Sequence, residues 1–429
     1  MNKKLLYLSR LLLTIFLLSP VPLLHAQPAR WCDSAWGDLV KSVQLCRDGI
    51  EMEEPVLTID HDGTGGERLL LTFDLLEEQP RDLRYRFIHC DRTWQPDELE
   101  PFEYYSGFEE QRIDDYRPSF TTLQAYTHYH TTFPTDYSRF LVSGNYIVAV
   151  YPYDQPDSIL LTRRFRVNEN LLEMSATVER ATSGGDLHRD QELSLVVEGP
   201  RNGNPAALAL LRPEYLHPWV QQNGRTDNMR ELAFSGYASG KLCYQWRDAN
   251  RFAGGNTFRY FDISNLRAPI YNIQRIERYG GETHVVLRAE EDRSRKVYRS
   301  EETLNGGMKI HVWDRTDNAV EADYAWVYFT LPMVRPMMDG SLHIVGALTD
   351  WRLDDASRLE WNAAQRAYTC RLLLKQGYYA YQLLFLPAGE TQGETARLEG
   401  DHSETPNRYH VYLYCRQPGE RYDRLIGVR

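Results

Sequence analysis

Hydrophobic and polar residues alternate with a period of two along much of the chain, which is the pattern of a β-strand with one buried face. The clearest run is 69–75, where leucine or phenylalanine occupies every second position. Similar runs occur at 84–90, 146–151 and 160–167. Turn-forming segments such as Ser143-Gly144-Asn145 separate them, because these residues tolerate positive φ at low cost. We therefore predict that residues 27–167 form a first β-sandwich.

Two further sets of strand patterns follow a polar break at 168–170. The first set lies at 176–178, 193–197, 232–234 and 285–287, and the second at 324–329, 342–345, 368–374, 379–385 and 409–415. Frequent glycine-containing reversals favour antiparallel sheets over βαβ units. We therefore predict a middle β-rich domain at 168–320 and a C-terminal sandwich at 321–429. The expected fold class is all-β, in tandem immunoglobulin-like β-sandwich domains.

The first residues have the three-part layout of a secretory signal peptide. Lys3 and Lys4 precede an apolar stretch at 11–18, which two prolines and then the small residue Ala26 follow. We predict cleavage after Ala26, which removes residues 1–26. The apolar stretch is far shorter than the roughly 20 residues that span a bilayer. We therefore expect a soluble secreted or periplasmic protein without a membrane anchor.

Charge and cysteine content narrow the possible partners and chemistry. The chain has 49 basic and 60 acidic residues, a formal charge of -11, which is the wrong sign for binding nucleic acid or an anionic lipid surface. Its six cysteines allow 15 pairings, and the sequence does not choose among them. No pair has the Cys-x2-Cys spacing of many zinc and redox sites, so we interpret the cysteines as structural.

Candidate chemistry is sparse. The sequence contains no Gly-x-Ser-x-Gly elbow, His-Glu-x-x-His pair or P-loop. His128 and His130 share one face of an extended segment, with Asp136 nearby, but two ligands do not make a metal site, and we interpret them as surface or hydrogen-bonding histidines. Trp351, with the tyrosines of 378–381, could stack on a sugar ring or pack in a core. We predict no catalytic residue, no metal and no cofactor.

Several short segments carry a resemblance to a known family. In the first block these are FIHCDRTWQP at 87–96, EYYSGF at 103–108, YTHY at 126–129 and SGNY at 143–146. Later segments are GGNTFRYFD at 254–262, LKQGYY at 374–379 and RYDRLIG at 421–427. Together they resemble the type IX secretion system plug protein family of the Bacteroidetes. Separately, the segments 346–351 and 377–381 are similar to the early-set immunoglobulin-like modules that include glycogen-binding domains.

The plug-family resemblance implies a non-enzymatic periplasmic subunit of the type IX secretion system. Such a protein binds the periplasmic mouth of the outer-membrane β-barrel translocon and closes its pore in the resting state. A loop-carried aromatic patch could supply the partner-binding residues, which we predict to be Tyr104, Tyr105, Phe108, Tyr126 and Tyr129. The alternative for these five is that they pack beneath the long connection 91–138.

Two other functions remain open from the sequence. The early-set resemblance is compatible with a secreted carbohydrate-binding β-sandwich protein, although the segment 387–407 is long and acidic compared with sugar-binding members. A hydrolase with no recognised motif is the third possibility.

Overall fold

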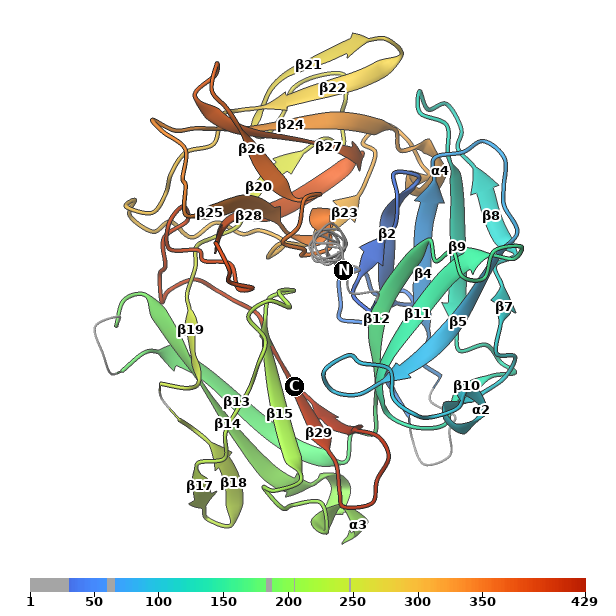
Figure 1. Cartoon of the computed structure of the whole chain (residues 1–429), viewed down its shortest axis with the longest axis vertical. Helices are drawn as coiled ribbons and strands as arrows, with labels where there is room; N and C mark the ends of the chain where they lie inside the picture. The colour runs from blue at the N-terminus through green and yellow to red at the C-terminus, as the bar shows by residue number, and fades with distance from the viewer. Residues whose placement is uncertain (1–30, 60–65, 183–186, 204, 247) are drawn as a thin grey trace, which may run out of the picture. The chain divides into compact units, whose positions relative to one another are not determined.

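The computed structural model describes residues 31–59, 66–182, 187–203, 205–246 and 248–429 (Figure 1). The predicted signal peptide, 1–26, lies outside the described residues. Residues Cys32–Arg429 form one compact unit that contains three hydrophobic cores, each enclosed by β-sheets. The prediction of an all-β fold with tandem sandwiches is confirmed. No helix in the described part of the chain is long and apolar enough to cross a membrane.

The first sandwich packs two larger sheets and a short two-stranded sheet. One sheet has the order β1 (Ser34–Ala35), β12 (Leu161–Asn168), β11 (Gly144–Pro152), β5 (Leu83–Cys90) and β7 (Gln111–Arg112), with β3 (Val56–Thr58) parallel to β12. The other has the order β2 (Val40–Arg47), β4 (Leu69–Leu75), β9 (Thr127–Phe133) and β8 (Asp115–Pro118). Helix α2 (Pro101–Tyr104) leads into β6 (Tyr105–Ser106), which pairs with β10 (Arg139–Phe140). The alternating residues Leu69, Leu71 and Phe73 point into the core, as their spacing predicts.

The second sandwich is built from two separate stretches of chain. Its first sheet has the order β13 (Leu172–Arg180), β14 (Asp190–Pro200), β18 (Lys241–Tyr244) and β17 (Gly236–Ala238), with β19 (Arg251–Ala253) also paired to β14. Its second sheet has the order β16 (Arg230–Glu231), β15 (Leu216–Gln222), β29 (Tyr409–Cys415) and β30 (Arg424–Val428). Two short helices, η1 (Arg201–Gly203) and α3 (Pro205–Leu208), follow β14.

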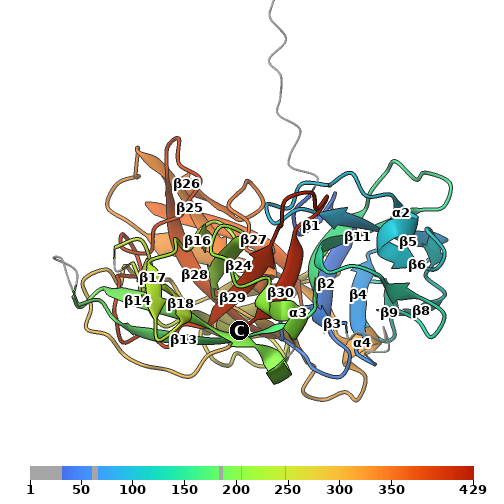
Figure 2. The ribbon, with the colours of Figure 1, turned by 90° about the horizontal axis from the view of Figure 1, so that it is seen from below.

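The third sandwich folds a nine-stranded sheet around one core. The strand order is β20 (Arg259–Asp262), β28 (Gly377–Pro387), β25 (Gly340–Val345), β26 (Arg358–Asn362), β27 (Ala367–Lys375), β24 (Tyr324–Pro332), β22 (Glu282–Leu287) and β21 (Ile273–Tyr279), and β23 (Met308–Ile310) also pairs with β28. Helix α4 (Asn318–Glu321) precedes β24, and η2 (Ala347–Thr349) follows β25. Figures 1 and 2 both show α4 beside β9 of the first sandwich.

Strand membership differs from the predicted blocks in two places. The sequence grouped 409–415 with the third block, but β29 pairs along its whole length with β15 of the second sandwich. It grouped 285–287 with the middle block, but β22 pairs with β24 of the third sandwich. The third sandwich is therefore an insertion within the second. The alternation of hydrophobic and polar residues predicts which face of a strand is buried, but it does not predict which strand lies beside it. Here β15 pairs with a strand about two hundred residues further along the chain. That each predicted block folds alone stays a prediction.

Candidate functional site

The structure separates the five aromatic residues predicted to bind a partner. Phe108 is 84% exposed, whereas Tyr104, Tyr105, Tyr126 and Tyr129 are buried. The four tyrosines therefore do not belong to an exposed binding patch, and this part of the prediction is corrected. They pack inside the protein instead. Burial is possible because each phenol ring fills a core while its hydroxyl group finds a polar partner. The Tyr104 hydroxyl donates to the Phe87 carbonyl at 2.8 Å, and the Tyr129 hydroxyl accepts from the Arg81 amide at 2.6 Å.

The buried tyrosines Tyr104 and Tyr105 support the loop that carries Phe108. Pro101 begins helix α2, and the Glu103 side chain accepts from the Glu100 amide at 2.9 Å, which fixes the helix start. Tyr105 then pairs with Phe140 between the antiparallel strands β6 and β10, and its ring centre lies 4.8 Å from that of Phe87. The loop after β6 is thus anchored in the aromatic core of the first sandwich.

Two exposed aromatic side chains lie at one end of the β6–β10 strand pair. Phe108 follows β6 and Tyr137, which is 95% exposed, precedes β10. The two loops touch, since a Cβ at Gly107 would lie 2.9 Å from the Cβ of Ser138. Phe102, on the adjoining helix α2, is also exposed. We call Phe108 and Tyr137 the aromatic patch. Exposed apolar clusters on a rigid support are typical of protein interaction sites.

A buried ion pair joins the first and third sandwiches. Asp74, on β4, accepts hydrogen bonds from the Lys375 ammonium group at 2.6 Å and the Tyr324 hydroxyl at 2.7 Å, through its Oδ2 atom. Its Oδ1 atom lies 2.6 Å from Nδ1 of His128, which gives that predicted hydrogen-bonding histidine its partner. Burial lowers the pKa of Lys375, and Asp74 opposes that shift. Lys375 also donates to the Ala319 carbonyl at 2.7 Å. All the polar atoms of this contact are therefore satisfied.

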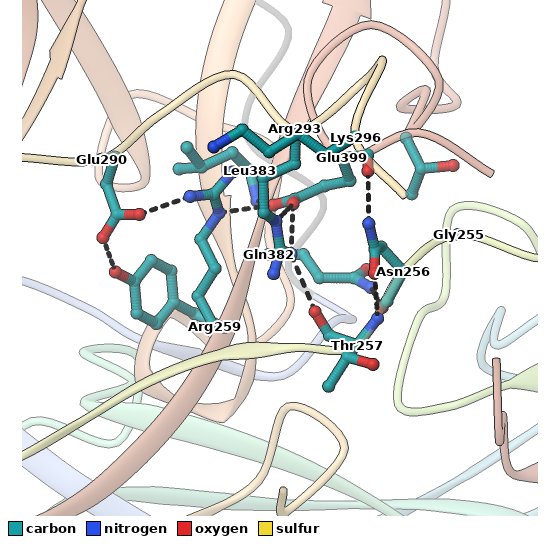
Figure 3. Close-up of polar contacts among 12 residues, drawn as sticks. Gly255, Asn256, Thr257, Arg259, Glu290, Arg293, Lys296, Gln382, Leu383 and Glu399 are labelled. Atoms are coloured by element: carbon teal, nitrogen blue, oxygen red, sulfur yellow. Dashed lines mark hydrogen bonds and ion pairs between the residues drawn. The ribbon is translucent and has the colours of Figure 1, made fainter. Parts of the chain in front are cut away.

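A second buried ionic network lies where the chain crosses between the second and third sandwiches (Figure 3). Glu399 is fully buried and accepts from Arg259 Nε at 2.9 Å and from Arg293 Nε at 2.8 Å. It also accepts from the Leu383 amide at 2.8 Å, and Glu290 pairs with the other side of the Arg259 guanidinium. A backbone hydrogen bond links the two segments that connect the second and third sandwiches: the His402 amide donates to the Gly255 carbonyl at 2.8 Å.

The Glu399 network makes stability depend on pH in the acid range. Burial by itself would raise the pKa of Glu399, but Arg259 and Arg293 lower it to about 2 from its ordinary value of 4.5. A carboxyl group with a lowered pKa in the folded state stabilises that state above its unfolded pKa, and the contribution is lost as pH falls through the folded pKa. We therefore expect about 3 kcal/mol of unfolding free energy to disappear progressively between about pH 4.5 and 2.

Urea denaturation followed by tryptophan fluorescence at several pH values measures this loss. The Glu399→Gln variant is the control, because its side chain does not titrate. Its unfolding free energy should fall less steeply than that of the unmodified chain across this range, and parallel curves for the two proteins would contradict the assignment to Glu399.

Contacts between the first and second sandwiches form a third junction. The Asp423 carboxylate, buried beside β30, accepts from the Arg92 amide at 2.9 Å and the Arg92 side chain at 3.0 Å. The Tyr414 hydroxyl donates to Asn145 Oδ1 at 2.6 Å. The Arg166 guanidinium lies 3.6 Å from the ring centre of Tyr412, a cation–π contact. Each contact pairs a side chain of one sandwich with one of the other.

A cavity of about 500 Å³ lies where all three sandwiches meet. Arg163 of the first sandwich donates to Asp350 of the third at 2.7 Å beside it. The Trp351 indole fills the space over two glycines, since a Cβ at Gly224 or Gly306 would lie within 2.3 Å of it. The ring therefore packs between the second and third sandwiches, which agrees with the packing alternative for this tryptophan, and the sugar-stacking role stays a prediction.

Backbone conformation around this cavity also depends on tertiary contacts. Seven lining residues adopt a left-handed φ: Ser42, Met52, Trp94, Asn223, Asn305, Asp350 and Trp351. This region is disfavoured for residues with a side chain, so the surrounding packing must hold it in place.

Sequence reasoning missed these junctions, although a signal was present. The segments that carry the family resemblance contain residues at the junctions between the sandwiches: Arg92, Asn145, Arg259, Lys375 and Asp423. Short polar motifs scattered over the whole chain have a common explanation if each supplies one side of an interface. Cys46, Cys90, Cys243, Cys370 and Cys415 are free thiols, and no group of three or more potential metal-ligating side chains occurs among the described residues.

Comparison with known proteins defines the class of the chain. Residues 40–169, the first sandwich, match the family described as the type 9 secretion system plug protein 1st domain. The crystal structure of a hypothetical protein from Parabacteroides merdae ATCC 43184 superposes with a TM-score of 0.87 at 30% sequence identity, over 94% of this chain and 99% of that chain. No curated protein matches.

The chain therefore belongs to the same family as the Parabacteroides merdae protein, with a type 9 secretion system plug first domain at its N-terminal end. This domain links the chain to the type 9 secretion system in the cell envelope. The similarity of the C-terminal segments to early-set modules stays a prediction.

Proposed function

We propose that the chain is a periplasmic plug subunit of the type 9 secretion system, which binds the periplasmic mouth of an outer-membrane β-barrel translocon and closes its pore in the resting state. The observation that carries the proposal is the aromatic patch, because it lies within the domain that matches the plug family. In this role the protein occupies an opening and catalyses no reaction.

The interlocked sandwiches support this function. A plug must keep its shape while it blocks the pore. The buried contacts of Asp74 and Asp423 hold neighbouring sandwiches together, and those of Glu399 stabilise the segments that connect the second and third sandwiches. The patch itself is small, and the exposed acidic residues Glu109, Glu110 and Asp136 lie next to it in the sequence. Such an interface can be displaced, whereas a large obligate hydrophobic one could not.

The double substitution Phe108→Ser, Tyr137→Ser should abolish translocon binding while the fold stays intact. Both side chains are almost fully exposed, so the unfolding free energy of the variant should differ from that of the unmodified chain by no more than about 0.5 kcal/mol. Aromatic anchors at an interface contribute about 2 kcal/mol or more each, so we expect binding to weaken at least about a hundredfold. Affinity purification of the tagged chain from detergent-solubilised envelopes measures recovery of the barrel.

Tyr237→Ser is the matched control, since Tyr237 is 64% exposed on the edge strand β17 of the second sandwich. In a strain without the chromosomal copy, the unmodified chain and this control should restore the barrier to vancomycin, and the double variant should not. Equal barrel recovery with the double variant would reject the patch as the docking surface. Failure of the unmodified chain itself to recover a large barrel would reject the plug function.

A further inference from the structure

The outer face of the third sandwich carries a second, larger cavity. Its volume is about 880 Å³, within the roughly 300–1,000 Å³ of small-molecule sites, and strands β21, β22, β24, β26 and β27 form its floor (top of Figure 1). These strands bury one face in the core through residues such as Val285, Val327 and Leu359. The alternate residues, among them Tyr328 and Glu360, therefore face the cavity.

A supported aromatic ring stands at one side of this cavity. Tyr279 is 58% exposed, and its ring stacks in parallel on the His284 imidazole, with ring centres 3.9 Å apart. His284 is in turn held by its Nδ1 atom, 3.0 Å from the Tyr328 hydroxyl. One face of the Tyr279 ring is thus fixed against the sheet while the other is open to a ligand.

His284 also presents an unused polar atom. The residue is 3% exposed, lines the cavity, and its Nε2 atom has no hydrogen-bond partner, the Glu282 carboxylate being 3.6 Å away. Buried polar atoms are normally satisfied, so an unpaired one at a cavity wall indicates a position that a ligand or water fills. A ligand hydroxyl group could donate to or accept from this nitrogen.

The charges of the cavity are balanced and paired with each other. Arg275 Nε lies 2.8 Å from Glu277, and Arg358 Nε lies 3.3 Å from Glu360. The Arg371 guanidinium lies over the Trp326 ring at 4.5 Å. The remaining lining includes the neutral side chains of Gln274, Thr330, Asn362, Gln365 and Thr369. With its arginines engaged by acids or an aromatic ring, the lining favours an uncharged polar ligand over a polyanion.

We propose that this cavity binds a neutral oligosaccharide. The open Tyr279 ring suits the apolar face of a sugar ring, and the amide, hydroxyl and imidazole groups suit sugar hydroxyls. The main chain of β22, β24 and β27, in the middle of the cavity floor, already pairs on both sides, so a ligand lying over these strands is held by side chains and not by main-chain hydrogen bonds. The site is independent of the aromatic patch, which belongs to the first sandwich.

The test is a glycan array followed by calorimetric titration of the full-length chain. We expect binding to at least one neutral glycan, and about tenfold weaker binding by the Tyr279→Ala variant. Asn362→Ala, at the opposite side of the cavity, should also weaken binding. Tyr237→Ala is the matched control, since it removes another exposed tyrosine from an edge strand, and its affinity should be unchanged.

Three outcomes would overturn the proposal. They are binding to no neutral glycan by the folded chain, equal affinity of the Tyr279→Ala and unmodified chains, and a preference for sulfated or other polyanionic glycans. Thermal denaturation of each variant shows whether a loss of binding follows from unfolding. Because the site goes beyond the plug function, barrel recovery by the Tyr279→Ala variant should be normal.

Discussion

Asp74→Ala lowers the free energy of unfolding by about 3–5 kcal/mol at pH 7, the largest effect that we expect from a single substitution. The carboxylate and the Lys375 ammonium group are both almost completely buried, with side-chain exposures of 1% and 2%. Without Asp74, the ammonium group keeps the Ala319 carbonyl at 2.7 Å and the Tyr126 ring, whose centre is 4.2 Å away, but it stays inside the protein without a counter-ion. The Tyr324 hydroxyl loses its acceptor at the same time.

Urea denaturation followed by intrinsic fluorescence measures this loss. Asp136→Ala is the matched control, since Asp136 pairs with Arg68 in the same sandwich but is 75% exposed. Surface ion pairs contribute about 0–1 kcal/mol, so the control should unfold almost as the unmodified chain does. A difference of less than 1 kcal/mol between the two variants would show that the Asp74–Lys375 contact does not hold the first and third sandwiches together.

Glu399→Gln should lower the unfolding free energy by about 3 kcal/mol or more at pH 7. Glutamine keeps the size of the side chain but removes the charge that Arg259 and Arg293 share. Arg259 retains Glu290, whereas Arg293 loses its carboxylate partner. Breaking a buried ion pair by removing one partner costs several kcal/mol, because the remaining charge has lost both its water and its counter-ion.

Chemical denaturation at pH 7 measures the effect, and Glu277→Gln serves as the control. Glu277 forms an ion pair with Arg275 on the exposed strand β21, so its loss should change stability by less than about 1 kcal/mol. Hydrogen exchange should also speed up in the crossing segments near Gly255 and His402 for Glu399→Gln alone. Unchanged hydrogen-exchange rates near Gly255 and His402 would contradict the role of Glu399 in stabilising the segments that connect the second and third sandwiches.

The alternation of hydrophobic and polar residues along the chain was enough to predict most strands. Leu69, Leu71 and Phe73 alternate with partly exposed residues, and all three lie in the core of the first sandwich. The same reasoning failed to assign strands to sandwiches, as β29 shows. A period-two pattern depends on neighbours in the chain, whereas pairing of Leu413 with Pro218 depends on contacts between residues far apart in sequence.

The partner-binding residues show the same division. Tyr126 and Tyr129 carry large rings next to polar residues, and such a composition fits either an interface or a core. Their burial depends on parts of the chain far away in sequence. The third sandwich supplies the hydrogen-bond partner of the Tyr126 hydroxyl, and the loop at Arg81 supplies that of the Tyr129 hydroxyl. Phe108 follows Gly107 in the loop between β6 and β7, and its side chain is 84% exposed. Its exposure stays consistent with the predicted binding role.

By itself, the sequence determined the all-β class, the positions of most strands and the resemblance to plug proteins, because these depend on local alternation, turn residues and short motifs. Only the tertiary structure decided that the third sandwich is inserted into the second, that four of the five aromatic residues are internal, and that Asp74 meets Lys375. The reason is physical: a buried charge or ring is stable only with its partner in place, and that partner is brought there by the folding of distant segments.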